Sequence, residues 1–232
     1  DVIIGTHHAY IGMGGPAMIE GGGLGTFKPE EIGPPSVHAK NGVLDYIATD
    51  EASATSFAKQ VLSVLSGSPE KSRPPAEFDL TSQMPINRKI VFDVRTIIEA
   101  VVDEASLLEF RREFGSALVT ALARIDGKPV GILASDPAKN GGAIDGEAAA
   151  KAAGLFKLCQ SSRLPVISLI DTPGFMVGPQ AEETGQARAI GEMFRTGASI
   201  AVPIMAIILR RAYGLGAMAM AGGGFHSADL AI

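Results

Sequence analysis

The sequence has a single cysteine, Cys159, so the chain cannot form an internal disulfide. This shortage is typical of proteins in a reducing compartment, and we expect a cytoplasmic protein. Long hydrophobic runs are also lacking, because the longest covers residues 200–209 and contains a proline. A helix that crosses a bilayer needs about 20 apolar residues. The sequence therefore predicts no membrane span.

Histidines and clustered basic residues are scarce as well. Only four histidines occur, and the pair His7-His8 has no cysteine or carboxylate nearby at the spacing of metal ligands, so we expect no metal site. The formal net charge is −5, and lysines and arginines do not cluster beyond Arg111-Arg112 and Arg210-Arg211. A nucleic-acid surface normally needs a basic patch, so we expect no nucleic-acid partner.

Apolar residues and glycine, by contrast, are abundant. Hydrophobic residues make up 46% of the chain, which is enough for a sizeable core. The 28 glycines occur in clusters, and glycine lets a backbone approach another group closely. The sequence begins at Asp1 inside an apolar run, and residues 229–232 read as the first half of a strand. We interpret it as a piece of a longer protein.

Composition and periodicity divide the chain into three segments. Residues 1–66 combine a short strand, a glycine-rich stretch and a helix with Asp50 as its N-cap. Residues 67–90 are polar, rich in proline and without periodicity, which is typical of a linker. Residues 91–232 alternate apolar strands with helices, which predicts an α/β fold with largely parallel pairing.

The third segment allows a more detailed prediction. Apolar residues at helical spacing predict helices at residues 94–102, 107–114, 146–161 and 182–198. Apolar runs predict strands at residues 116–125, 129–134, 164–170 and 202–209. Asp126-Gly127 joins the first two strands and indicates a hairpin. A helix start rich in glycine and alanine and a final strand complete the segment.

Three chemical interpretations fail because a second residue or motif that each requires is missing. Asp171-Thr-Pro-Gly174 follows a strand as the switch of a GTPase does, but no phosphate-binding Gly-x-x-x-x-Gly-Lys-Ser/Thr loop accompanies it. Gly12-Met-Gly14 and Gly214-Leu-Gly216 lack the acidic residue that a dinucleotide fold places at a strand end about 20 positions further on. Cys159 lies on an apolar helix stripe without a neighbouring histidine, so we interpret it as a core residue rather than a nucleophile.

Three glycine-rich turns after predicted strands have a chemical interpretation. They are Gly141-Gly142, residues 171–178 and residues 213–217. Free backbone N–H groups in such turns stabilise a developing oxyanion, each donor contributing about 3 kcal/mol. Simple tight turns have the same composition, so the glycines alone leave both interpretations open.

The same turns belong to longer motifs that resemble the carboxyltransferase (beta) subunit of biotin-dependent acyl-CoA carboxylases of the propionyl-, acetyl- and methylcrotonyl-CoA type. These motifs are residues 119–134, Gly141-Gly-Ala-Ile-Asp145, Asp171-Thr-Pro-Gly-Phe-Met-Val-Gly178 and Ile208-Leu-Arg-Arg-Ala-Tyr-Gly214. Residues 14–33 resemble the end of that subunit's first domain. The resemblance covers nearly the whole chain, in the family's order and spacing.

The resemblance implies a crotonase-like fold built from ββα units. Residues 1–66 would end the acyl-CoA-side domain, residues 67–90 would be a linker, and residues 91–232 would form a truncated biotin-side domain. The implied reaction is carboxyl transfer from carboxybiotin to the α (or vinylogous) carbon of an acyl-CoA thioester, with biotin removing the α-proton. The active site would lie between two subunits. Its acyl-CoA-side oxyanion hole would precede Asp1, so we expect this piece alone to be inactive.

Site residues follow from position in the motifs. Gly216 and Ala217 match the family's biotin-side oxyanion donors. Gly214 is a rival, because the turn at residues 213–217 is one residue longer than the Tyr-Gly-Gly-Ala of propionyl- and acetyl-CoA members. The residues implied to lie beside biotin are Asp171, Pro173, Gly174, Phe175, Gly178, Gly141, Gly142 and Tyr213. The longer turn resembles the methylcrotonyl branch and the 171–175 motif the propionyl branch, so the acyl preference stays open.

The resemblance also implies partners. These are a carrier protein that brings carboxybiotin, a biotin carboxylase subunit, a coenzyme A thioester as substrate, and further copies of the chain in a dimer-based oligomer such as a hexamer. Three alternatives stay open: a biotin-dependent decarboxylase, a scaffold subunit without catalysis, and a crotonase-type hydratase. A hydratase needs a glutamate base, whereas Glu182 and Glu183 read as acids in the first turn of a helix.

Overall fold

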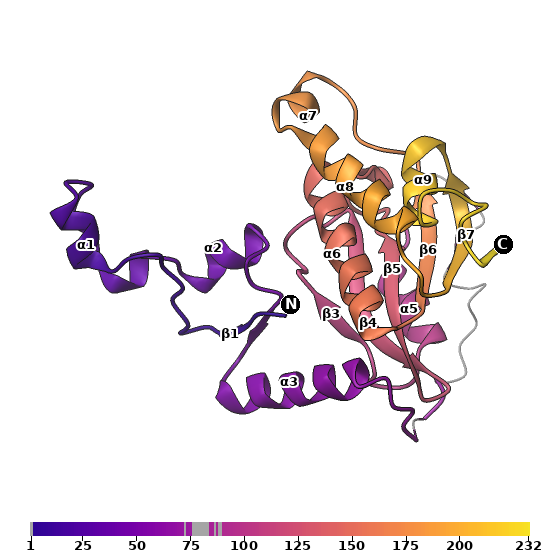
Figure 1. Cartoon of the computed structure of the whole chain (residues 1–232), viewed down its shortest axis with the longest axis horizontal. Coiled ribbons are helices and arrows are strands. Elements are labelled where there is room, and N and C mark those ends of the chain that lie inside the picture. Colours follow the sequence, from indigo (N-terminus) through magenta and orange to yellow (C-terminus); the bar gives the residue numbers. More distant parts are fainter. Residues whose placement is uncertain (1, 72, 76–83, 86, 88–89) are drawn as a thin grey trace.

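The computed structural model describes residues 2–71, 73–75, 84–85, 87 and 90–232 (Figure 1). The first part of the chain contains β1 (Ile4–Thr6), α1 (Pro16–Gly21), η1 (Pro29–Glu31), α2 (Pro35–Lys40), β2 (Tyr46–Ala48) and α3 (Glu51–Leu65). The second part contains α5 (Val94–Val101), β3 (Leu108–Phe110), β4 (Leu118–Ile125), β5 (Lys128–Ser135), η2 (Asn140–Gly142), α6 (Gly146–Ser162), β6 (Val166–Thr172), α7 (Pro179–Glu183), α8 (Gln186–Ala198), β7 (Ile204–Ala212), α9 (Gly214–Met220) and β8 (Leu230–Ala231).

The main sheet has the strand order β3-β4-β5-β6-β7-β8. β3, β4 and β5 pair antiparallel, whereas β5 to β8 pair in parallel. The β4–β5 hairpin turns at Asp126 and Gly127, whose φ angles of 52° and 73° are both positive, as a type I′ turn requires. The predicted hairpin and the largely parallel α/β fold are thus confirmed. One irregularity interrupts the β6–β7 ladder after Ile170, where the register shifts.

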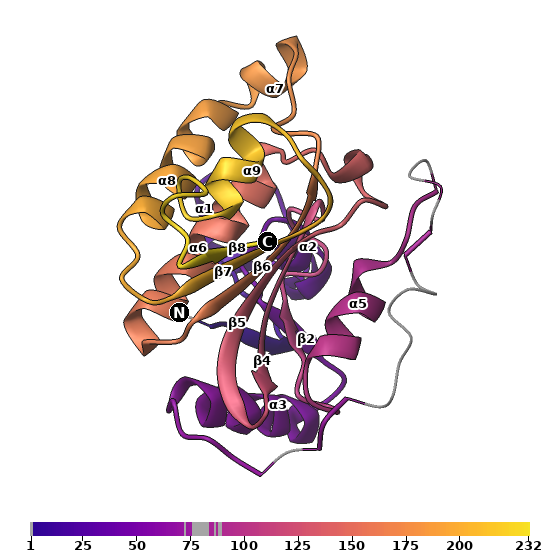
Figure 2. The same ribbon diagram turned by 90° about the vertical axis from the view of Figure 1, so that its right-hand side faces the viewer.

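Helices cover both faces of this sheet (Figure 2). On one face, α6, α8 and α9 share an apolar cluster with strand residues such as Leu118 and Ile170. On the other face, α5 packs against residues such as Val119 and Ile132. Because both faces are covered, the inner strands are almost entirely apolar. Cys159 of α6 lies in the first cluster, where burial raises the pKa of its thiol to about 12, as befits a core residue.

The first part of the chain packs on the sheet through α3. This helix begins after Asp50, whose carboxylate accepts a hydrogen bond from the Ser53 amide, so the predicted N-cap is confirmed. Its buried side chains Phe57, Val61 and Val64 belong to the same apolar cluster as the strands of the main sheet. β1 and β2 form a separate parallel pair. Residues 7–34, here called the N-terminal arm, project away from the rest of the molecule (Figure 1).

Two predicted helices are wrong or incomplete. Residues 107–114 contain strand β3, whose alternating burial at Leu108, Glu109 and Phe110 fits its pairing with β4. The predicted helix at residues 182–198 is divided into α7 and α8, because Gly185 adopts a left-handed conformation with φ of 68° between them. Part of the predicted linker, namely residues 72, 76–83, 86 and 88–89, lies outside the described residues. Every helix within the described residues is too short or too polar to cross a bilayer.

Candidate active site

The three glycine-rich turns lie together at one edge of the main sheet. η2 follows β5, the loop of residues 173–178 follows β6, and the turn into α9 follows β7, and these three strands are parallel neighbours. The Ile144 amide donates to the Gly174 carbonyl at 3.0 Å, and the Tyr213 amide donates to the Thr172 carbonyl at 3.1 Å. Ligands of parallel α/β sheets usually bind outside the carboxyl ends of the strands, which is where these turns meet.

Thr172, which the sequence analysis did not single out, connects two of the turns. Its hydroxyl donates to the Gly142 carbonyl at 2.6 Å and accepts from the Gly174 amide at 3.1 Å. The residue is fully buried at the end of β6. The only sequence signal for this role was its place inside the Asp-Thr-Pro-Gly motif.

Asp171 anchors this edge through two consecutive arginines. Arg210 donates from Nε and Nη2 to Asp171 Oδ2 at 3.0 and 2.6 Å, and Arg211 donates from Nε to Oδ1 at 2.8 Å. Arg211 also donates from Nη2 to the Gly141 carbonyl at 2.8 Å. The Asp171 side chain is completely buried. The Asp171 carboxylate therefore fixes the two arginines and, through Arg211, the turn at Gly141. It does not face a ligand.

Gly214 and Gly216, the two rival oxyanion donors, have different surroundings. Gly216 is buried, and a Cβ at this position would lie 2.8 Å from the Gly174 carbonyl carbon and 2.9 Å from its Cα. Only glycine therefore lets α9 pack this closely on the loop after β6. Gly214 is exposed, has φ of 59°, and has open space around it. The extra residue of the turn, Leu215, is 60% exposed.

Most backbone amides around the turns are already paired. The Gly174 and Met176 amides donate to Thr172 Oγ1 and to the Ile144 carbonyl, and the Ala217 amide donates over 3.5 Å to the Tyr213 carbonyl. The first amides of any helix have no acceptor within the helix. In α9 these are the amides of residues 214–216, which are candidate donors for a ligand at this edge.

The other residues predicted for the site lie on the same three turns. Gly141 and Pro173 are exposed, whereas Gly142 is buried beneath them. Phe175 is half-buried, bridges to Ile144 and lies 6.2 Å from the Phe194 ring. Gly178, with φ of 121°, precedes α7, and Tyr213 is 59% exposed beside α9. The structure thus brings all the predicted site residues to one edge, while Glu182 and Glu183 lie on α7.

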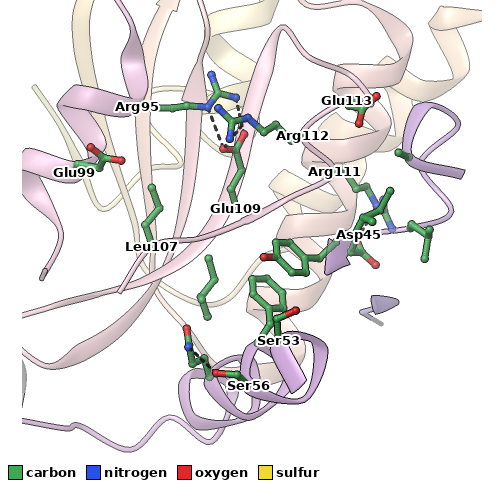
Figure 3. A pocket seen from close by; sticks show the side chains of 17 residues that line it. Asp45, Ser53, Ser56, Arg95, Glu99, Leu107, Glu109, Arg111, Arg112 and Glu113 are labelled. Atoms are coloured by element: carbon green, nitrogen blue, oxygen red, sulfur yellow. Dashed lines mark hydrogen bonds and ion pairs between the residues drawn. The ribbon is translucent and has the colours of Figure 1, made fainter. Parts of the chain in front are cut away.

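A separate cleft of about 740 Å³ lies among α3, α5 and β3 (Figure 3). Tyr46 and Phe57 stack in its lining with ring centroids 3.7 Å apart. Arg95 donates from Nε and Nη2 to the Glu109 carboxylate at 3.0 and 2.5 Å, and this hydrogen bonding raises the pKa of Arg95. Arg95 pairs with Glu109 and Arg111 pairs with Asp45 in this lining, and no predicted site residue lines the cleft. No three His, Cys, Asp or Glu side chains are grouped as metal ligands within the described residues.

Comparison with known proteins gives one consistent family. Residues 1–230 match the carboxyl transferase domain. The methylmalonyl-CoA carboxyltransferase 12S subunit of Propionibacterium freudenreichii subsp. shermanii is 33% identical over 95% of this chain and 44% of its own length. The uncharacterized carboxylase YngE of Bacillus subtilis (strain 168) is 37% identical over 85% of this chain and 40% of its own. The chain therefore spans less than half the length of these curated relatives.

Solved structures agree with the sequence comparison. A single-chain, multi-domain long-chain acyl-CoA carboxylase superposes with a TM-score of 0.95 at 53% identity, covering 99% of this chain and 23% of that one. The transcarboxylase 12S structure with hydrolyzed methylmalonyl-coenzyme A bound superposes with a TM-score of 0.86 at 31% identity, over 100% of this chain and 49% of that one. The α/β fold is accordingly crotonase-like, as expected. With its motifs in order, its turns at one sheet edge and its match over residues 1–230, the chain belongs to the carboxyl transferase domain family.

Proposed function

We propose that this chain forms the biotin side of a biotin-dependent acyl-CoA carboxyltransferase. Its full-length parent then transfers a carboxyl group from carboxybiotin to the α (or vinylogous) carbon of an acyl-CoA thioester. One observation carries the proposal: three turns meet at the carboxyl ends of β5, β6 and β7, where the first amides of α9 have no acceptor within their helix. Membership of the carboxyl transferase domain family supports it.

The chain's own residues supply binding and electrostatics at this edge. Carboxybiotin, when bound, supplies the carboxyl group. The amides of residues 214–216 would hold the ureido oxygen of bound biotin, and each such donor contributes about 3 kcal/mol to stabilising negative charge there. The glycines at 214 and 216 leave room for a ring to reach the backbone, because neither carries a side chain.

The Asp171 carboxylate at the meeting point of the turns is not free to act as a base. Both oxygens of Asp171 accept hydrogen bonds from arginines, and the carboxylate is fully buried. General base catalysis requires a group within hydrogen-bond reach of the substrate proton. This arrangement favours a reaction in which the bound biotin takes the proton over a hydratase with a glutamate base.

Assembly with further copies and with a biotin carrier is part of the proposal. Met13, Met18 and Leu24 of the N-terminal arm are 104%, 72% and 75% exposed. Several large apolar side chains exposed on one short segment are consistent with a contact surface. The 12S transcarboxylase structures are described as a hexamer with substrate bound to a multienzyme core. We expect the parent to form a dimer-based oligomer and to receive carboxybiotin from a carrier linked to a biotin carboxylase.

The test is carboxyl transfer to free biotin by the full-length parent, from malonyl-, methylmalonyl- and methylglutaconyl-CoA in turn. Transfer from one of these thioesters would support the proposal and identify the acyl class. A folded, oligomeric parent that transfers from none of them, while a known carboxyltransferase is active in the same assay, would contradict it.

A further inference from the structure

We propose that Thr172 is a positioning residue for the biotin-side turn, with Arg211 as its second support. Neither side chain is assigned contact with a ligand. Both act on the backbone of the three turns, and the inference rests on the function proposed above.

The Thr172 hydroxyl satisfies two backbone groups on different turns at once. It donates to the carbonyl of Gly142 at 2.6 Å and accepts from the amide of Gly174 at 3.1 Å. A hydroxyl has one proton and two lone pairs, so a single oxygen fills both roles. Valine has the same shape but has neither a donor nor an acceptor, so it would leave both buried backbone groups unpaired.

Gly174 packs directly against the first turn of α9, so the position of one fixes the position of the other. A Cβ on Gly216 would lie 2.8 Å and 2.9 Å from the carbonyl carbon and Cα of Gly174, so the two backbones already pack as closely as glycine allows. A shift of Gly174 therefore moves the first turn of α9, whose amides are the proposed donors. A misplacement of about 1 Å in a catalytic arrangement can cost a factor of about 100 in rate.

Arg211 also supports η2, the turn that contains Gly141 and Gly142, through a contact that does not involve Thr172. Its Nη2 donates to the Gly141 carbonyl at 2.8 Å while its Nε donates to Asp171 at 2.8 Å. If Arg211 is replaced by Met, Arg210 still donates two hydrogen bonds to the Asp171 carboxylate. The substitution Arg211→Met therefore removes the support of Gly141 and the hydrogen bond to Asp171 Oδ1, while Asp171 Oδ2 keeps both hydrogen bonds from Arg210.

Ser168 provides a matched control on the same strand. Its hydroxyl is fully buried in β6, as that of Thr172 is, but among the residues that the structure describes it has no hydrogen-bond partner. The substitution Ser168→Ala thus removes a buried hydroxyl that supports no turn. We expect it to leave the transfer reaction unchanged.

The experiment measures carboxyl transfer from the preferred CoA thioester to free biotin, with full-length parent carrying Thr172→Val, Thr172→Ser or Ser168→Ala. Thr172→Val should lower kcat/KM for biotin by about 10- to 100-fold, because the donors are displaced. KM for the CoA thioester should change by less than about twofold, since Thr172 is proposed to act on the biotin side of the site. Thr172→Ser keeps the hydroxyl and should recover most of the activity.

Each outcome decides the inference. A folded Thr172→Val variant with normal kcat/KM for biotin overturns it, and so does a Thr172→Ser variant that is equally impaired. A smaller folded fraction would lower kcat and leave both KM values unchanged, so the inference also requires a raised KM for biotin. If Thr172→Val does not fold, Arg211→Met takes its place and must show the same biotin-specific loss. A wild-type parent without any transfer contradicts the proposed function itself, whereas an active wild type matched by Thr172→Val contradicts this inference alone.

Discussion

Lys151 on α6 is a buried cation with one hydrogen bond to the backbone. Its side chain is nearly inaccessible, with 2% of the residue exposed, and Nζ donates to the Leu118 carbonyl at 2.8 Å. Burial is the main reason why the pKa of Lys151 falls from 10.5 to about 8, and the nearby charge of Glu109 opposes the fall. The free energy of unfolding therefore depends on pH through the ionisation of Lys151.

The sign of this effect leads to a prediction. Between pH 8 and 10.5 the unfolded chain retains a proton that folded Lys151 gives up, so the free energy of unfolding rises with pH across this window. The contribution amounts to about 3 kcal/mol, at 1.36 kcal/mol per pKa unit. The Lys151→Met variant lacks this pH-dependent contribution. The stability of the variant relative to wild type should therefore be greatest below pH 8 and decline towards pH 10.5. Urea unfolding of both proteins at pH 7 and pH 10.5 measures the difference.

Lys157→Met serves as the control for this comparison, because it removes an exposed lysine from the same helix and makes the same change in net charge. A stability difference between wild type and Lys151→Met that does not vary with pH would show that burial of the Lys151 ammonium carries no cost.

The sequence revealed less about single side chains than about turns. Arg210 and Arg211 stood out only as a basic pair and as members of a motif, and Thr172 only as a member of a motif. Their partners are distant in sequence: 30 residues separate Thr172 from Gly142, and 70 separate Arg211 from Gly141. Such pairings depend on strand order, which local patterns do not specify.

At the scale of elements, the turn into α9 and the loop after β6 behave as one packed unit. A Cβ at Gly216 would meet the backbone of Gly174, which cannot move aside as a flexible side chain can. We expect Gly216→Ala to cost about 1–3 kcal/mol of stability, as overpacking does, and to reduce transfer to biotin at least tenfold. Gly214→Ala meets open space and should cost only the left-handed strain of about 1–2 kcal/mol. Urea unfolding and the transfer assay test both variants.

The two substitutions also distinguish the rival donors. If Gly214→Ala impairs transfer more than Gly216→Ala does, at equal or better stability, then the exposed glycine has the larger catalytic role and the packing argument for Gly216 is wrong.

Elements with local signals were the ones that the sequence predicted well. The hairpin at Asp126-Gly127 needs positive φ at two adjacent residues, a requirement visible in the residue types themselves. Residues 107–114 were predicted as a helix because their apolar side chains fit both periods. Residues 108–110 form a strand because they pair with β4, and this pairing is a tertiary effect that local patterns do not show. Gly185 likewise ends α7 and separates it from α8, although the apolar stripe continues.

At the scale of the whole molecule, the N-terminal arm is the part with the least support from the rest of the chain. No residue of α1 is buried, and Met18 is 72% exposed. If the arm contacts a second copy, Met18→Glu in the full-length parent should reduce the assembled fraction, because burying a charge at an apolar contact is costly. Analytical ultracentrifugation measures the mass of the assembly. Met18→Leu keeps the apolar contact and should match wild type.

An unchanged mass for Met18→Glu, at concentrations near the dissociation midpoint of the wild type, would place the contact between copies elsewhere on the molecule.

The interrupted ladder between β6 and β7 explains how one carboxylate holds two consecutive arginines. Between the pairs Ile170–Ile208 and Thr172–Ala212, two steps along β6 correspond to four along β7. Neighbouring side chains of a regular strand point to opposite faces, yet Arg210 and Arg211 both reach Asp171. Residues 209–211 of β7 lie opposite Asp171 alone, so this stretch departs from the regular alternation and both arginines turn to one carboxylate. The two extra residues are an even number, so the alternation of β7 is the same on both sides of the irregularity. The spacing of β7 therefore matters to the site as much as the identity of its side chains.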